Sequence, residues 1–221
     1  MALYIDSAYL NDITAVAQTV PVAGVTTNPT LLLDAHQRGQ KASVEEVIAH
    51  ILQRINGTIF LQPSLANEEQ AYREALAYLQ IDEERILPKI PMCKTGVRVA
   101  RRLHAEGHHI AFTAVTTVSQ AYIAATLGAD YIIPYYNRMR RSGVDPSERI
   151  KQMARIIANQ ETTTRIMASS IKSTAEAAEA LLSGAHDLTV PPAILLEMTT
   201  DPETEEAITR FERDSQKMKN L

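Results

Sequence analysis

Lys89 is the residue of this sequence whose surroundings most plainly suggest chemistry. It lies in the apolar stretch RILPKIPM (residues 85–92), and it is the only one of seven lysines within a predicted strand. An ammonium group is costly to desolvate, and lysine is rarely buried without a partner. Burial lowers the pKa of a lysine, so the neutral amine can attack a carbonyl and form a Schiff base. The alternative is a structural lysine paired with a carboxylate such as Asp6.

Polar residues occur where predicted strands end, in seven of the eight strands: Asp6, Thr26, Asn28, Gln62, Lys89, Thr113, Tyr135, Ser169 and Ser170. Some have an ordinary structural explanation, because Asn28 before Pro29 suits a turn and Thr113 or Ser170 suits a helix cap. In a parallel barrel, however, all carboxyl strand ends meet on one face, where barrel enzymes carry their active sites. We therefore expect one site there. Lys172, just past the seventh strand, is a weaker candidate that binds an anion or faces solvent.

Eight short β-rich runs must position these residues. They span residues 3–6, 22–26, 58–62, 86–90, 109–114, 131–135, 165–169 and 186–190. Helical patterns separate them, as at 43–55, where apolar residues follow the spacing of an amphipathic helix. Helices are expected to end at Gly107, Gly128 and Gly184, because glycine accepts a left-handed C-cap. Alternating strands and helices predict an α/β fold, a (β/α)8 TIM barrel over residues 1–200, with a doubly wound sheet as the alternative.

Helix-start signals refine this assignment. A Ser or Thr followed three residues later by Glu or Gln, the capping-box pattern, occurs at 117–120 and 173–176. Residues 201–221 predict an additional C-terminal helix that starts at Asp201 and Pro202. Its apolar stripe is thin, so this helix either covers the barrel or reaches another subunit. We expect the second.

Composition narrows the class of protein. The chain has 221 residues, of which 45% are hydrophobic and 22% charged, which suits one domain with a sizeable core. A net charge of −4, an aromatic share of 5% and the lack of Trp argue against nucleic-acid and anionic-membrane partners. No apolar run is long enough for a transmembrane helix, and MALYIDSAYL lacks the basic leader of a signal peptide. With a single cysteine, Cys93, the sequence predicts a cytoplasmic protein.

Metal and cofactor sites find little support. None of the six histidines ends a predicted strand, and Gly107 separates His104 from His108. The sequence has no G-x-G-x-x-G, P-loop or G-x-S-x-G motif. Cys93 has no histidine placed to activate it, so we predict a loop residue and not a nucleophile. We expect no metal and no organic cofactor.

Four segments together resemble the small-barrel transaldolase and fructose-6-phosphate aldolase family over nearly the full chain: LYID (3–6), AGVTTNPT (23–30), KIP (89–91) and PYYNR (134–138). The resemblance implies a class I aldolase with sugar-phosphate or ketose substrates and no cofactor, assembled as a pentamer or decamer. Lys89 matches the Schiff-base lysine and Asp6 the acid beside it. Thr26 and Asn28 match residues that meet the donor hydroxyls.

The acceptor side follows from the same resemblance. Gln62, Thr113 and Tyr135 match a trio that holds a catalytic water. Arg138 and Ser170 match the groups that bind the acceptor phosphate. Three residues depart from the family pattern or are unusual in their place: Pro88, Cys93 and Pro63.

The resemblance also separates two activities. Transaldolases of this kind carry Glu at the Gln62 position and Phe at the Tyr135 position, whereas aldolases carry Gln and Tyr. An amide cannot exchange a proton by ionising, so Tyr135 and Thr113 must orient the water. The sequence therefore predicts an aldolase that cleaves or forms fructose 6-phosphate. The alternatives are a transaldolase that transfers a dihydroxyacetone unit and a sugar-phosphate-binding or structural assembly without turnover.

Overall fold

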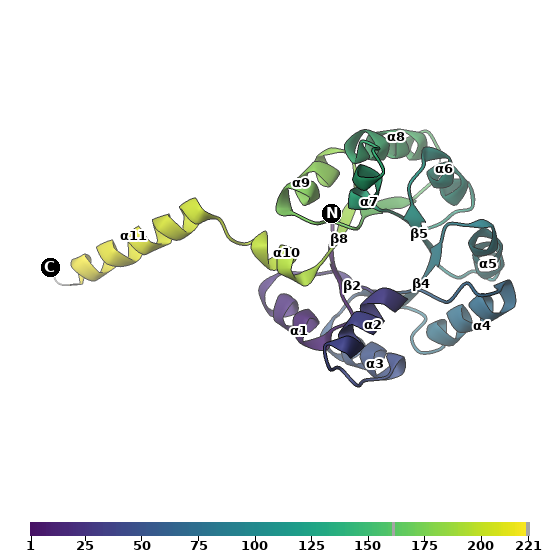
Figure 1. Cartoon of the computed structure of the whole chain (residues 1–221), viewed down its shortest axis with the longest axis horizontal. Coiled ribbons are helices and arrows are strands. Elements are labelled where there is room, and N and C mark those ends of the chain that lie inside the picture. Colours follow the sequence, from purple (N-terminus) through teal and green to yellow (C-terminus); the bar gives the residue numbers. More distant parts are fainter. Residues whose placement is uncertain (161, 220–221) are drawn as a thin grey trace.

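The computed structural model describes residues 1–160 and 162–219 and has eight parallel strands closed into a barrel in chain order (Figure 1). The strands are β1 Leu3–Asp6, β2 Gly24–Thr26, β3 Thr58–Leu61, β4 Ile86–Pro91, β5 Ala111–Val115, β6 Tyr131–Pro134, β7 Arg165–Ala168 and β8 Asp187–Val190. Strand β1 pairs with both β2 and β8. The TIM-barrel prediction is therefore confirmed, and the doubly wound alternative is excluded.

Helices surround the barrel, as Figure 1 shows. They are α1 Leu10–Thr19, α2 Pro29–Gln37, α3 Val44–Arg54, α4 Glu68–Leu79, α5 Lys94–Ala105, α6 Val118–Thr126, α7 Tyr136–Arg141, α8 Pro146–Ala158, α9 Thr174–Leu182, α10 Pro192–Glu197 and α11 Pro202–Met218. The sequence predicted one helix after each strand and missed the extra helices α2 and α7. Both begin within a few residues of a strand end, so they add structure to the rim where the site was expected.

The helix ends largely follow their predicted signals. Gly107, Gly128 and Gly184 have φ angles of 90°, 82° and 101°, as left-handed C-caps require. The box at 117–120 is complete. At 173–176 only half of it forms, because the Glu176 side chain accepts from the backbone N–H of Lys172 instead of from the N-cap residue.

Strand alternation divides the core into two layers. Ile86 and Ile90 of β4 pack outward with the helices, whereas Leu87 packs inside the barrel with Phe60 and Met167. Because side chains on a strand alternate, Lys89 shares the inner side with Leu87. Strand β4 thus delivers its lysine to the barrel interior.

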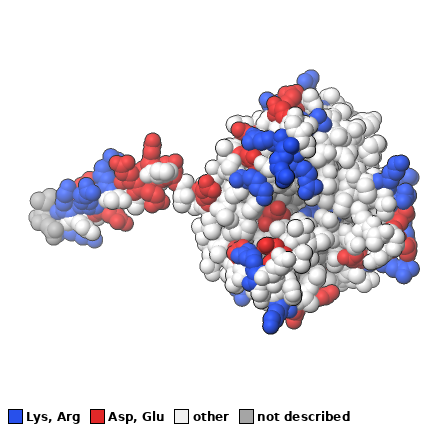
Figure 2. Space-filling model, in the orientation of Figure 1, with Lys and Arg blue, Asp and Glu red and all other residues white. Residues whose placement is uncertain are grey.

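Helix α11 extends away from the barrel (Figure 1) and has no buried residue between Pro202 and Met218. Of the predicted helical segment 201–221, residues 220–221 lie outside the described residues. Acidic side chains gather on the barrel-proximal half of the helix and basic ones on the distal half (Figure 2). Across the described residues, no helix combines the length and apolar character needed to span a membrane.

Candidate active site

A cavity of about 480 Å³ opens at the carboxyl ends of the strands. Its lining residues are Asp6, Asn28, Pro29, Thr30, Leu31, Gln62, Lys89, Pro91, Ala114, Ile133, Tyr135, Arg138, Ser169, Ser170, Lys172 and Thr189. Seven of the nine residues predicted for the site are among them. The other two, Thr26 and Thr113, are fully buried and hydrogen-bond to lining residues.

Lys89 is the buried cation of this cavity. Its side chain comes from the middle of β4, and the residue is only 3% exposed. Desolvation lowers the pKa of Lys89 to about 8, although the charge of Asp6 acts in the opposite direction. A substantial share of this amine is therefore neutral near physiological pH, unlike that of an exposed lysine.

Helix α5 packs tightly against the end of β4 and helps to fix it. A Cβ added to Gly96 of α5 would lie 2.0 Å from the carbonyl oxygen of Pro91. No larger side chain fits there without moving the backbone on one side. Glycine therefore allows the helix to approach the strand that carries Lys89.

Two threonine side chains hold Asp6 through a chain of hydrogen bonds. The Thr26 hydroxyl donates to Asp6 Oδ1 at 2.8 Å, and the Oγ1 atoms of Thr26 and Thr189 are 2.6 Å apart. Since Thr26 gives its only hydroxyl proton to Asp6, Thr189 must donate to Thr26. This directed, buried chain orients the carboxylate at the cavity wall, and such chains strengthen each of their bonds. Thr26 does not line the cavity itself, but it orients Asp6, which does.

Asn28 has both a structural and a site position. It is the N-cap of α2, and its Oδ1 accepts from the Leu31 backbone N–H at 3.0 Å. The turn interpretation is thus partly correct. Because the amide oxygen is engaged, the side-chain NH2 is the group left to donate toward a ligand oxygen in the cavity.

Tyr135 and Thr113 lie together on one side of the cavity. The Thr113 hydroxyl donates to the Tyr135 hydroxyl at 3.3 Å, and neither residue acts as a side-chain cap. Beside them β5 has a register irregularity between Thr113 and Val115, with Ala114 in the left-handed region at φ 58°. This bulge turns the end of β5 and brings Ala114 to the cavity lining.

Cationic groups border the outer part of the cavity. Arg138 comes from α7, and its guanidinium carbon lies 4.6 Å from the centroid of the Tyr135 ring. Basic side chains gather over α7 on the face seen in Figure 2. Ser170 follows β7 in a left-handed conformation, φ 59°, which is uncommon for serine. Lys172 lines the same cavity.

Thr189 is the main site residue that the sequence analysis missed. The last residue of β8 is Val190, which is apolar, so that strand seemed to supply no polar end. Alternation carried the missing signal: Leu188 and Val190 pack with the outer core, which turns Asp187 and Thr189 inward.

Known proteins of similar sequence identify the family of this chain. A sequence profile described as Transaldolase/Fructose-6-phosphate aldolase matches residues 3–221. The chain belongs to the transaldolase/fructose-6-phosphate aldolase family. It is 32% identical over 216 residues to a "Probable fructose-6-phosphate aldolase" of Streptococcus pneumoniae, covering 97% of this chain and 96% of that relative. It is 31% identical over 217 residues to a "Probable transaldolase" of Bartonella tribocorum, covering 98% and 97%.

A solved structure shows the same barrel at greater distance. A "putative deoxyribose-phosphate aldolase" from Coccidioides immitis superposes with a TM-score of 0.61 at 16% identity, covering 90% of this chain and 85% of that chain. At that identity the likeness concerns the fold alone. The transaldolase/fructose-6-phosphate aldolase family is thus supported by sequence, and the barrel by both sequence and structure.

The departures from the family pattern lie outside the cavity lining. By strand alternation Pro88 faces the helices, as Ile86 and Ile90 do. Cys93 is the N-cap of α5, and its Sγ accepts from Gly96 N–H at 3.4 Å, a weak form of the bond that threonine makes at such a cap. Neither Pro88, Cys93 nor Pro63 lines the cavity of this family member.

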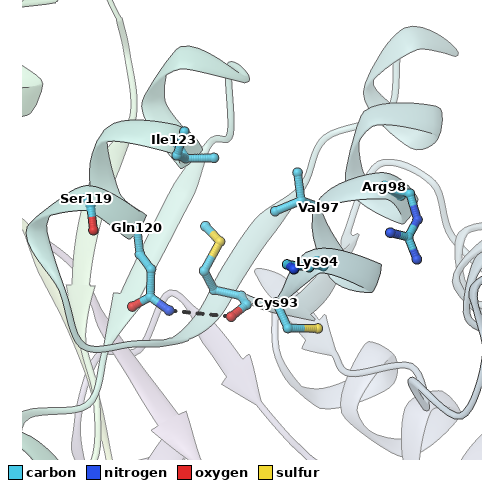
Figure 3. Close-up of a pocket in the computed structure, with 8 residues that line it drawn as sticks. Cys93, Lys94, Val97, Arg98, Ser119, Gln120 and Ile123 are labelled. Atoms are coloured by element: carbon cyan, nitrogen blue, oxygen red, sulfur yellow. Dashed lines mark hydrogen bonds between the residues drawn. The ribbon is translucent and has the colours of Figure 1, made fainter.

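Cys93 borders a different hollow, between α5 and α6 (Figure 3). Its lining includes Val97 and Ile123, and Gln120 Nε2 donates to the carbonyl of Met92 at 3.4 Å. The thiol points away from Gln120 in Figure 3. In residues 1–160 and 162–219, no group of three or more His, Cys, Asp or Glu side chains could hold a metal ion.

Proposed function

We propose that this protein is a class I aldolase that cleaves and forms fructose 6-phosphate through a Schiff base on Lys89. The observation that carries the proposal is a desolvated lysine, with its pKa lowered to about 8, in a strand-end cavity. A carbonyl substrate entering this cavity meets a partly neutral amine, which is the nucleophile that imine formation needs. Membership of the transaldolase/fructose-6-phosphate aldolase family supports the same chemistry.

The proposed reaction begins when Lys89 Nζ attacks the C2 ketone and water is lost, which leaves an iminium. A water held by Tyr135, Gln62 and Thr113 takes the C4 hydroxyl proton while the C3–C4 bond breaks. The bonding electrons move to the iminium nitrogen, and glyceraldehyde 3-phosphate leaves. The enamine then takes a proton at C3, and a second water hydrolyses the imine to dihydroxyacetone and free Lys89.

The remaining residues bind the sugar in this proposal. Asn28 donates its side-chain N–H to the hydroxyls of the donor half, and Asp6 lies beside the amine, held by Thr26 and Thr189. Arg138 offers two parallel donors to the acceptor phosphate, and Ser170 adds a hydroxyl.

Reductive trapping tests the proposal. Treatment with borohydride in the presence of dihydroxyacetone or fructose 6-phosphate should add one three- or six-carbon unit to the peptide that contains Lys89. Peptide mass mapping gives the position. Modification at Lys94 or Lys172 would refute the assignment of the nucleophile, and a panel of other ketoses would identify the preferred donor.

The second candidate is a transaldolase, which passes the dihydroxyacetone unit to an aldose. The similarity to a relative named as a transaldolase favours it. Gln62 and Tyr135 favour the aldolase, because the family resemblance associates Glu and Phe at these positions with transfer. Faster transfer to erythrose 4-phosphate than cleavage of fructose 6-phosphate by the wild-type protein would decide for the transaldolase.

We also propose that α11 serves assembly of a homo-oligomer. Ile208, Phe211 and Met218 are 44%, 62% and 69% exposed, an unusual state for large apolar side chains on one helix. Truncation after Thr200 should lower the subunit number measured by light scattering, with the barrel still folded by circular dichroism. An unchanged subunit number would refute this role.

A further inference from the structure

Glu176 is a buried carboxylate that the reaction described above does not use. It lies in the first turn of α9, and its side chain is 5% exposed. Carboxylates are rarely buried unless they are paired. Its partners therefore define what it does.

The two oxygens of Glu176 contact two different segments. Oε1 accepts from Asn137 Nδ2 at 2.9 Å and from Arg140 at 3.1 Å, both on α7. Oε2 accepts from the backbone N–H of Lys172 at 2.8 Å, in the loop after β7. One side chain thus bridges α7 and this loop.

These two segments carry the proposed phosphate ligands. Arg138 lies between Asn137 and Arg140 on α7, and Ser170 lies two residues before Lys172. Backbone bonds join the segments as well, because Tyr136 N–H donates to Ser169 O at 2.9 Å and Asn137 N–H to Ser170 O at 3.2 Å. The left-handed backbone of Ser170 is uncommon for serine and needs such support.

We propose that Glu176 is a positioning residue that holds Arg138 and Ser170 at the spacing a phosphate monoester requires. The inference rests on the proposed function, since it assigns Arg138 and Ser170 to phosphate. Glu176 engages Arg140 and leaves Arg138 to face the cavity. Glu176 should therefore matter for the binding of phosphorylated acceptors. The binding of unphosphorylated aldehydes should not depend on Glu176.

The test uses the full-length protein and Glu176→Gln. Glutamine keeps the size of the side chain, but its NH2 cannot accept from either segment, so the bridge loses one side. Glu179→Gln is the matched control. Glu179 also bonds Arg140, at 2.8 Å, and Tyr136, but its side chain is 47% exposed and bonds only α7 among these segments.

Two readouts separate positioning from general stability. With dihydroxyacetone as donor, Glu176→Gln should raise the KM for glyceraldehyde 3-phosphate about ten- to a hundredfold and leave kcat and KM for glyceraldehyde within about twofold. Calorimetry should show a matching loss of affinity for inorganic phosphate. Glu179→Gln should change neither value. Glu176→Asp, which retains the charge, should recover part of the loss.

Each outcome bears on the proposal. If Arg138→Ala weakens phosphate binding and Glu176→Gln does not, the phosphate site stands and the role of Glu176 is wrong. Equal loss with both acceptors would make Glu176 merely structural and would likewise overturn the inference. If Arg138→Ala also leaves phosphate affinity unchanged, the proposed phosphate site itself fails, and the role of Glu176 fails with it.

Discussion

The two ends of the barrel interior treat buried polar groups in opposite ways. At the amino end, Asp187 is fully buried, accepts two bonds of 2.7 Å from Arg165 and accepts a third from Ala2 N–H. At the carboxyl end, Lys89 is almost as deeply buried, but desolvation lowers its pKa, and the charge of Asp6 offsets that shift only in part. The charge of Asp187 at the amino end is thus stabilised by hydrogen bonds, whereas a charge on Lys89 at the carboxyl end is destabilised by desolvation.

Aromatic packing completes the contrast. Tyr4, Phe60 and Tyr131 pack edge to face inside the amino end, with Phe60 5.3 Å from Tyr4 and 5.1 Å from Tyr131 between ring centroids. The hydroxyls of Tyr4 and Tyr131 are 3.3 Å apart, and burial raises the pKa of Tyr4, so this phenol stays neutral. The amino end is thus filled, whereas the carboxyl end holds a cavity. The hydrogen-bonded charge of Asp187 helps to close the amino end, whereas the desolvated amine of Lys89 lines a cavity that a substrate can enter.

The largest expected effect comes from Lys89→Met. Loss of the nucleophile should reduce cleavage of fructose 6-phosphate by a factor on the order of 10⁴ or more. The same change should raise the free energy of unfolding at pH 7 by up to about 3 kcal/mol, since a pKa of about 8 against 10.5 marks the cost of the buried charge. That gain is complete below pH 8 and disappears toward pH 10.5.

Thermal or denaturant unfolding at several pH values checks the stability of Lys89→Met. Lys94→Met, which removes an exposed lysine outside the cavity, is the control for both measurements. A Lys89→Met protein that still cleaves fructose 6-phosphate would show that the buried lysine at the carboxyl end is not the nucleophile.

Two tyrosines at opposite ends of β6, Tyr131 and Tyr135, allow a test of the difference between the two barrel ends. Tyr135→Phe should reduce aldol cleavage about 10²–10⁴-fold, because the proposed water loses an orienting hydroxyl. Tyr131→Phe removes the hydroxyl that bonds Tyr4 at the amino end and should lower stability by about 1 kcal/mol with little change in kcat. Steady-state kinetics and urea unfolding of the pair give the answer. Equal losses of kcat would contradict the assignment of Tyr135.

Removing the buried hydrogen bonds at the amino end of the barrel should lower stability and leave kcat unchanged. Asp187→Ala leaves Arg165 and the Ala2 N–H without their shared acceptor, so the free energy of unfolding should fall by about 3 kcal/mol. This is the lower end of the usual range, because the Arg165 side chain is 40% exposed. Urea unfolding measures the loss. A large fall in kcat of the folded variant would indicate coupling between the two ends.

The smallest effect is a pH dependence at the carboxyl end. Lysine is protonated below its pKa, so imine formation should rise about tenfold per unit from pH 6 to 7 and level off above pH 8. Asp6→Asn should move the midpoint to lower pH, because the charge of Asp6 raises the pKa of Lys89. Single-turnover trapping over pH 6–9.5 tests both. A midpoint near 10 would show that Lys89 is solvated.

The sequence predicted much of this architecture because its signals are local. Strand and helix periods, together with Gly107, Gly128 and Gly184, were enough to predict the barrel. The burial of Lys89 could be expected because the residue lies in an apolar predicted strand. Helices α2 and α7 were missed because α7 is short and α2 starts directly at a Pro, where a loop was expected. Alternation along β8 could have indicated that Thr189 points inward, but its bond to Thr26 and the bonds of Glu176 to α7 join residues far apart in the chain, a distance at which periodicity carries no information.

The pairing of β1 with β8 has a consequence for how the chain reaches this state. Leu3 lies opposite Leu188, so the seam that closes the barrel joins residues from nearly opposite ends of the sequence. Loop-closure entropy and contact order make such pairs slow to form. During synthesis β1 can pair with β8 only after β8 has left the ribosome. Until then the edge of β1 that faces β8 has no strand partner. The bond from Ala2 N–H to Asp187 fastens the seam once it has closed. This sequence must therefore keep the unpaired edge of β1 from aggregating during synthesis, in addition to stabilising the closed barrel.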